Sequence, residues 1–154
     1  MSTKNNAARM YREAAVRGAS PVGLVIILYE EALRALRRAE TAMGRGDVEE
    51  RTHALTHAME VIGYLQSVLD FERGGRVAHQ LSTFYNHSRG RMLEASVKNS
   101  AEILGQLIAD FTESTEAWRE VERAITAGLK AGAGAGAVAA HAAAREEEFL
   151  LRSA

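Results

Sequence analysis

The sequence predicts an all-α protein: an antiparallel up-down four-helix bundle with a short N-terminal helical segment and an Ala/Gly-rich C-terminal tail. The first observation is that its 154 residues include a single proline, Pro21, so long stretches are free to be helical. The second is that apolar residues recur every three or four positions over four long segments, whereas strand-type alternation is hard to find. Long helices joined by short turns lie antiparallel to their neighbours.

The first long helix is predicted to begin at Pro21 and to end in the sequence GRGD. Ser20 suits the capping position, and Pro21 suits the first turn because the N–H that proline lacks has no helical partner there. The run 22–29 is apolar on all sides, which exceeds the stripe of about 100° that a bundle helix needs. One face carries the row Leu24, Leu28, Ala32, Ala35, Ala39 and Ala42.

The second helix is predicted to start near Asp47, which has capping-box spacing to Glu50. Its seam is Leu55, Ile62 and Leu69, with Ala58 and Leu65 between them. The sequence FERGGR at 71–76 is expected to break the helical pattern, because adjacent glycines disfavour a helix. The third helix is expected from about 77 to 97. Its predicted inward residues are Leu81, Phe84, Tyr85, Ser88, Met92 and Ala95.

The fourth helix and the two ends complete the predicted organisation. The fourth helix has the clearest row, formed by Leu104, Leu107, Phe111, Ser114, Trp118, Val121 and Ile125. Residues 4–17 are predicted to form the short N-terminal helical segment, so that 1–127 make one bundle domain. Residues 128–154 are predicted to be a low-complexity tail: a flexible Ala/Gly linker, then a marginal helix or disorder. The thin apolar face of that tail consists of Val138, Ala142 and Phe149.

Composition excludes several classes of function. The absence of cysteine rules out disulfides, thiolate catalysis and cysteine-based metal sites, and fits a reducing cytosol. A net charge of -1 argues against a nucleic-acid partner or an anionic membrane surface. Residues 1–15 lack the apolar core of a signal peptide, and no run reaches the ~18 apolar residues of a membrane span. We therefore expect a cytoplasmic protein without membrane insertion.

Patterns that carry chemistry are scarce. His53 and His57 lie four residues apart and could hold a metal on one helix face, but the repeated Glu-x-x-His motifs of di-iron bundles are missing. A solvated pair is therefore the favoured interpretation. The glycines at 74 and 75 lack the Gly-Lys-Ser/Thr ending of a phosphate loop. We predict no catalytic residue, no metal site and no cofactor, and a metal-dependent enzyme on a helical bundle stays an alternative.

Four motifs together carry a family resemblance. They are YREAAVRGASPVGLVIILYEEAL at 11–33, GDVEER at 46–51, VIGYLQSVLDFERGGRVAHQLSTFYNHSRGRMLEASVKNS at 61–100 and DFTESTEAWREV at 110–121. In this order and spacing, the chain resembles the flagellin-specific secretion chaperone family FliS over about residues 8 to 124. The family's antiparallel helical bundle is similar to the fold expected from the residues.

The resemblance implies a non-catalytic, cytoplasmic export chaperone. Such a chaperone binds the disordered C-terminal segment of flagellin, prevents premature polymerisation and aids delivery to the flagellar export apparatus. The export gate, met together with flagellin, is a further candidate partner. A groove that takes amphipathic helices would serve this role, because it covers apolar faces until export. The alternative is a helical-bundle adaptor that binds another amphipathic helix, such as a flagellar regulator.

Six residues are candidates for client binding. By resemblance, Tyr11 stands at the N-terminal tyrosine position associated with the client, and we add Met10 and Val16 beside it. The surplus apolar face of the first long helix adds Val25, Ile26 and Tyr29. We expect this face to be covered by the N-terminal segment or to be used by a client helix. We also expect residues 138–151 to fold back over an apolar groove when no client is bound.

Overall fold

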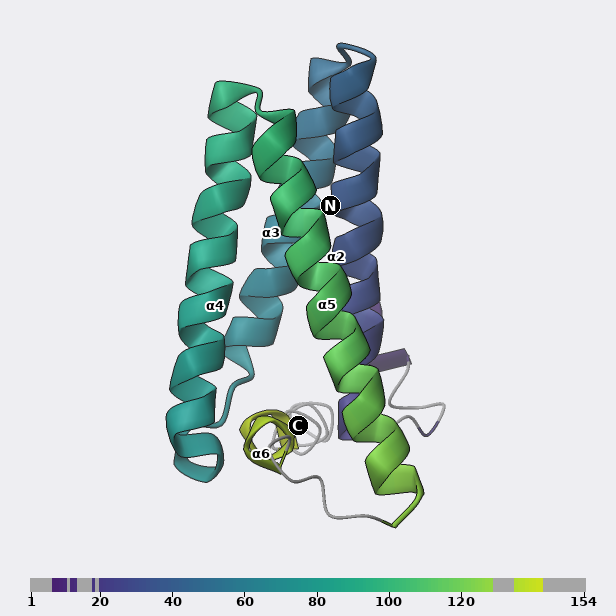
Figure 1. Cartoon of the computed structure of the whole chain (residues 1–154), viewed down its shortest axis with the longest axis vertical. Coiled ribbons are helices and arrows are strands. Elements are labelled where there is room, and N and C mark those ends of the chain that lie inside the picture. Colours follow the sequence, from purple (N-terminus) through teal and green to yellow (C-terminus); the bar gives the residue numbers. More distant parts are fainter. Residues whose placement is uncertain (1–6, 11, 14–17, 19, 129–134, 143–154) are drawn as a thin grey trace.

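Four long helices form an antiparallel ring in the computed structural model, which describes residues 7–10, 12–13, 18, 20–128 and 135–142 (Figure 1). Short turns join successive helices, and each helix packs on its neighbour in the chain, with the last returning to the first. The predicted all-α bundle is confirmed. The helices are α2 (Pro21–Gly44), α3 (Val48–Ser67), α4 (Phe71–Lys98), α5 (Ala101–Thr126) and a short α6 (Ala135–Ala142).

Each long helix begins at a polar cap whose side chain accepts a hydrogen bond from a backbone N–H three residues on. The Ser20 hydroxyl oxygen accepts from the N–H of Gly23 at 3.0 Å, and Pro21 follows in the first turn as predicted. The Asp47 carboxylate accepts from the N–H of Glu50 at 3.1 Å. Caps also start α4 and α5, where they are Asp70 and Ser100. The helix boundaries are therefore set by local chemistry.

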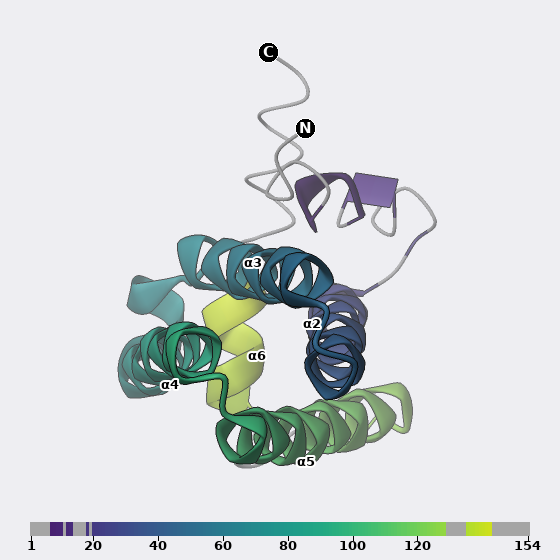
Figure 2. The same cartoon turned by 90° about the horizontal axis from the view of Figure 1, so that it is seen from above.

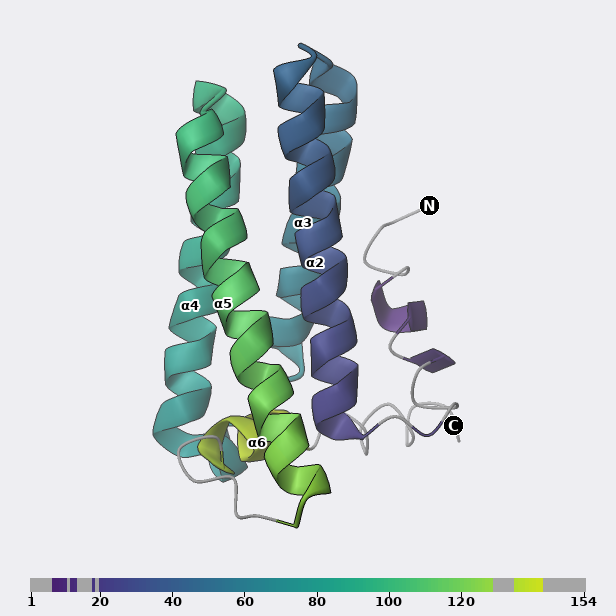
Figure 3. The same cartoon turned by 45° about the vertical axis from the view of Figure 1, so that its right-hand side comes forward.

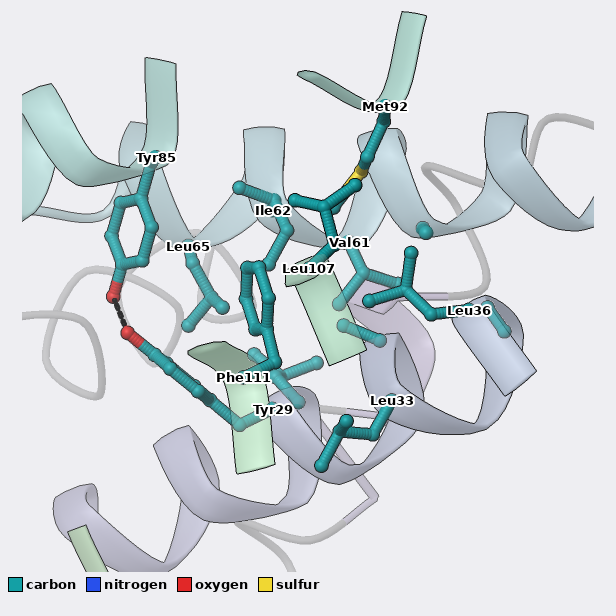
Figure 4. Packing of buried hydrophobic residues seen from close by; sticks show 14 of the residues in the cluster. Tyr29, Leu33, Leu36, Val61, Ile62, Leu65, Tyr85, Met92, Leu107 and Phe111 are labelled. Atoms are coloured by element: carbon teal, nitrogen blue, oxygen red, sulfur yellow. Dashed lines mark hydrogen bonds between the residues drawn. The ribbon is translucent and has the colours of Figure 1, made fainter. Parts of the chain in front are cut away.

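The predicted seams meet in one continuous core, except that Ile125, the last residue of the row on α5, is exposed. The whole small-residue row of α2, from Leu24 to Ala42, is buried. Figure 4 shows side chains from α2, α3, α4 and α5 converging, with Leu36, Ile62 and Phe111 among them. Alanines along α2 present little side-chain bulk at the bundle centre, and the larger residues of the other helices fill that space.

The predicted break at 71–76 is wrong in extent. Helix α4 begins at Phe71 rather than near 77, and within it only Gly75 leaves helical geometry, with φ 50° and ψ -125°. Because glycine has no Cβ, it adopts this conformation at little steric cost. One glycine thus produces a kink where the adjacent pair predicted a break.

The predicted solvated histidine pair is also wrong for one of its members. His53 is exposed, but His57 is buried and bonds to a carboxylate oxygen of Glu31 on α2 at 2.8 Å. That hydrogen bond is the main cause that lowers the pKa of Glu31 to about 2, and Arg34 adds to it. The pair ties α2 to α3.

The tail differs from its prediction at the point where it is described. Helix α6 starts at Ala135, inside the Ala/Gly repeat, and crosses the open end of the ring (Figure 2). Its fully buried side chains are Ala140 and His141, whereas Val138 is partly exposed. The predicted linker at 129–134, and Phe149, lie outside the described residues. Of the segment 138–151 that was expected to fold back, residues 138–142 belong to α6, which packs on the bundle, and 143–151 lie outside the described residues.

The described part of the chain contains neither a candidate membrane-spanning helix nor a candidate cluster of metal ligands. No helix there has both the length and the hydropathy to cross a bilayer. No three of its His, Asp and Glu side chains gather closely enough to bind a metal ion.

Candidate functional site

An apolar pocket lies between α4 and α5, on the side of the bundle where these helices separate. Figure 1 shows α5 starting beside α4 and leaning away from it toward the opposite end. Helix α5 packs more extensively on α2 than on α4. The resulting pocket has a volume of about 550 Å³. It is lined by Tyr29, Leu81, Phe84, Ser114, Ala117, Trp118, Glu120, Val121, Ala124 and Ala137.

Aromatic rings form the inner wall of this pocket. The ring of Tyr29 lies 6.1 Å from that of Trp118 and 5.8 Å from that of Phe111, measured between centroids. Phe84 lies 5.3 Å from Phe111 across the α4–α5 interface. Tilted and edge-on contacts at these distances are favourable for aromatic pairs, so the wall is apolar and its rings stabilise one another. A pocket of this kind suits apolar side chains.

A chain of hydrogen bonds runs beneath the pocket from α2 through α4 to α6. The Tyr29 hydroxyl donates to the Tyr85 oxygen at 2.8 Å, and the Tyr85 hydroxyl lies 3.0 Å from Nε2 of His141. Figure 4 shows the first of these bonds. In this arrangement Tyr85 donates to His141, whose proton then resides on Nδ1. Three buried polar groups are thus linked across 112 residues of chain, from 29 to 141.

Burial keeps all three of these groups uncharged near neutral pH. Desolvation raises the pKa of Tyr29 to about 12 and that of Tyr85 further above its usual value. Desolvation also lowers the pKa of His141 to about 4, because the buried site disfavours the imidazolium. The chain is therefore held together by neutral hydrogen bonds.

Helix α6 closes one end of the pocket. Ala137 belongs to the lining, and the His141 ring stands edge-on to Trp118 at 5.6 Å. Figure 3 shows α6 between the lower ends of α4 and α5. The pocket is thus bounded partly by the tail and partly by the bundle.

Charged pairs mark the outer surface beside the pocket. Arg119 of α5 bonds to Glu30 of α2 at 2.6 Å, which fixes the two helices relative to each other. Glu116 accepts from Arg123 at 3.0 Å on the solvent side of α5. The hydrogen bond from Arg123 is the main cause that lowers the pKa of Glu116. These ion pairs lie outside the lining of the α4–α5 pocket, in which Glu120 is the charged residue among those described.

The six predicted residues fall in different places. Tyr29 lies at the pocket, whereas Val25 and Ile26 are buried in the core. Met10 is partly buried on the helical stretch 7–10, near Ala7, which is fully buried in the same core cluster. Tyr11 and Val16 lie outside the described residues. Of the four candidates that the structure describes, it brings Tyr29 to the pocket.

Other residues of the pocket were predicted to be core. Trp118, Phe84 and Leu81 all stood in the inward rows, and a periodic row does not reveal where two helices part. His141 had no sequence signal, because it sits in an Ala-rich stretch with a weak apolar face. The hydrogen bond between His141 and Tyr85 becomes apparent only when α6 and α4 are placed together in the fold.

Comparison with known proteins gives consistent results. A protein-family model described as Flagellar protein FliS matches residues 3–125, and its match ends before α6. The chain is 34% identical to Flagellar secretion chaperone FliS of Salmonella typhimurium over 110 residues, which cover 71% of this chain and 82% of that protein. The protein of the same name from Campylobacter jejuni is 34% identical, over 66% of this chain and 80% of that protein.

A third relative extends the same pattern. Flagellar secretion chaperone FliSB of Pseudomonas aeruginosa is 33% identical over 106 residues, which cover 69% of this chain and 84% of that protein. All three names describe chaperones, which are not an enzyme class.

Proposed function

This chain belongs to the flagellar protein FliS family, and from that premise we propose that it is a cytoplasmic export chaperone for flagellin. In this role it binds the disordered C-terminal segment of flagellin, prevents premature polymerisation and aids delivery to the flagellar export apparatus. The observation that carries the proposal is the family match, which spans residues 3–125 and so covers the four long helices. The export gate, met together with flagellin, is a further proposed partner.

The pocket between α4 and α5 supports this function physically. A disordered segment that folds on binding gains affinity by burying apolar side chains, and it loses part of that gain in ordering. An apolar pocket with an aromatic wall can bury such side chains and so supply the gain in affinity. The entropy lost when the segment becomes ordered lowers the net affinity. A lower affinity suits a client that must be released at the export apparatus.

The proposed client-binding residues are Met10, Tyr11, Val16, Val25, Ile26 and Tyr29. Tyr29 supports the proposal most directly, because it lines the α4–α5 pocket. Val25 and Ile26 are buried, in a cluster that also contains Ala7. Because both side chains are buried, a client would contact them only after a neighbouring segment moves, and we propose that the N-terminal segment is the one that moves.

Co-purification with the host's own flagellin tests the function. We expect the full chain to retain intact flagellin and to lose flagellin that lacks its C-terminal segment. Binding that is indifferent to this segment would contradict the proposal. Failure to bind flagellin, together with capture of a different amphipathic helix, would favour the adaptor alternative.

Tyr11→Ala tests the family-derived position. We expect it to weaken the flagellin complex by at least about tenfold, as an aromatic hot spot does, with helicity and melting temperature nearly unchanged. Calorimetric titration and circular dichroism measure the two quantities. Val97→Ala is the control, because Val97 is an exposed apolar residue at the far end of α4. A large loss of stability in Tyr11→Ala would instead make Tyr11 a core residue.

A further inference from the structure

Helix α6 sits on the bundle in the way a bound helix would. It crosses the open end of the ring and packs mainly on α4, with a smaller contact to α2 (Figure 2). The backbone N–H of Asp70 donates to the carbonyl oxygen of Ala140 at 2.7 Å, which satisfies a carbonyl at the C-terminal end of α6. The family match stops at residue 125, so this helix lies outside the matched region.

The contact between α6 and α4 requires small residues on both sides. A Cβ placed on Gly74 of α4 would lie 2.6 Å from both Cα and Cβ of Ala140. A Cβ on Gly136 of α6 would lie 2.6 Å from a methyl carbon of Val77. Both distances are far below van der Waals contact. At Gly74 the neighbour is the backbone of Ala140, so the two helices approach there as closely as glycine permits, whereas at Gly136 it is the Val77 side chain. The α4 surface therefore selects a helix with alanine or glycine on its contact face.

One polar side chain completes the fit. His141 reaches the Tyr85 hydroxyl through Nε2, while its Nδ1 has no hydrogen-bond partner among the described residues. A buried ring nitrogen without a partner is unfavourable, because docking removes it from water and gives it no replacement hydrogen bond. The bundle thus offers α6 one hydrogen-bonding group, the Tyr85 hydroxyl. It offers no partner to the other ring nitrogen of His141 among the described residues.

These features make α6 easy to displace. It has eight residues, and an isolated helix of this length is not stable in water, so α6 is helical only while it is docked. Docking must therefore offset the ordering of the segment as well as the unpartnered N–H. The pocket of about 550 Å³ beside Ala137 also shows that α6 fills only part of the space between α4 and α5.

We propose that the α4 surface covered by α6, together with the adjoining pocket between α4 and α5, is the seat of a client helix, and that α6 is a built-in, displaceable competitor for this seat. The client helix that fits presents small apolar residues to Gly74 and Val77, and larger apolar side chains to the pocket beside Phe84 and Val121. This inference rests on the proposed flagellin-binding function and adds where the client docks and what must leave first.

Hydrogen exchange on the full chain tests the displacement directly. The probe is the C-terminal segment of the host's flagellin, added at saturating concentration. We expect the amides of 135–142 to lose protection while those facing the seat on α4 and α5 gain it. Unchanged or increased protection of 135–142 in the saturated complex would overturn the inference.

A pair of full-chain variants tests the competition by affinity. Ala140→Leu cannot be accommodated against Gly74, so it should undock α6 and tighten flagellin binding by about five- to hundredfold, the range of typical coupled sites. Ala139→Leu is the matched control, because it makes the same change at the adjacent, partly exposed position and should leave the affinity near that of the parent. Equal affinities for the parent and both variants would overturn the inference and leave the proposed function standing. No binding to any of the three would overturn the proposed function, and the inference with it.

Discussion

Tyr85 is the residue through which three helices share one polar contact. Its hydroxyl accepts from Tyr29 of α2 and faces His141 of α6, and all three side chains are buried. In a low-dielectric interior, a buried polar group that loses its hydrogen-bond partner destabilises the fold. The position therefore tolerates no loss of the hydroxyl, even though a phenylalanine would fill nearly the same volume.

Tyr85→Phe should lower the free energy of unfolding by about 2 kcal/mol, because it leaves Tyr29 and His141 without their buried partner. Urea denaturation followed by circular dichroism measures this. Thr83→Ala removes an exposed hydroxyl that bonds within its own helix, and should stay within about 0.5 kcal/mol of the parent. A Tyr85→Phe variant as stable as the parent would show that the chain contributes nothing.

At the scale of the element, α4 is shaped by two adjacent glycines with different roles. Gly74 has no room for a Cβ because Ala140 lies against it, whereas Gly75 has open space but a positive φ of 50°. The first glycine permits α6 to approach, and the second lets the helix begin early at Phe71. The two adjacent glycines thus allow α6 to pack closely on α4 and allow α4 to begin at Phe71.

Gly75→Ala should destabilise the protein by about 1 kcal/mol or more, since a Cβ disfavours that backbone conformation. Gly90→Ala is the matched change in the regular part of the same helix, where nothing lies within 4 Å of the new Cβ. It should stabilise by about 0.5–1 kcal/mol through helix propensity. Urea midpoints compare the two, and a stabilising Gly75→Ala would contradict the kinked geometry.

At the scale of the whole molecule, the tail and the bundle form one hydrogen-bonded unit whose docking depends on pH. Docked His141 has a pKa of about 4, whereas an undocked histidine has one near 6.5, so the undocked state binds the proton more tightly. Docking is therefore strongest at neutral pH and weakens by up to about tenfold per unit as the pH falls from 6.5 to 4. The groups that face His141 are Tyr85 of α4 and Trp118 of α5, with Tyr29 behind them, and the raised pKa values keep both tyrosines protonated throughout.

Acidification from pH 7 to 4.5 should release α6 before the bundle unfolds. Trp118 is the only tryptophan of the chain and contacts His141, so its emission should shift to the red while helicity changes little. Glu31 has a pKa of about 2, so its contribution to stability is lost only below about pH 4.5. His53→Gln should keep the transition, because His53 is exposed, and His141→Gln should abolish it. A Trp118 spectrum unchanged down to pH 4.5 would contradict the release.

Part of the candidate site could be predicted from the sequence. Apolar periodicity identified Phe84, Trp118 and Val121 as inward residues, and they are buried or partly buried. It could not show that α4 and α5 separate around them, because periodicity describes one helix at a time. The surplus apolar residues Val25 and Ile26 are in the core, and whether a client reaches them stays a prediction.

The sequence alone determined the caps at Ser20 and Asp47, the inward rows, the all-α bundle and the family resemblance. Each of these depends on residues within a turn, along one helix, or in a fixed order along the chain. Tertiary structure decided that His57 bonds to Glu31, that Gly75 carries the kink, and that α6 fills the end of the ring. These outcomes depend on segments distant in the chain, such as Tyr85 and His141, whose meeting follows from the packing of the whole bundle and from no local pattern.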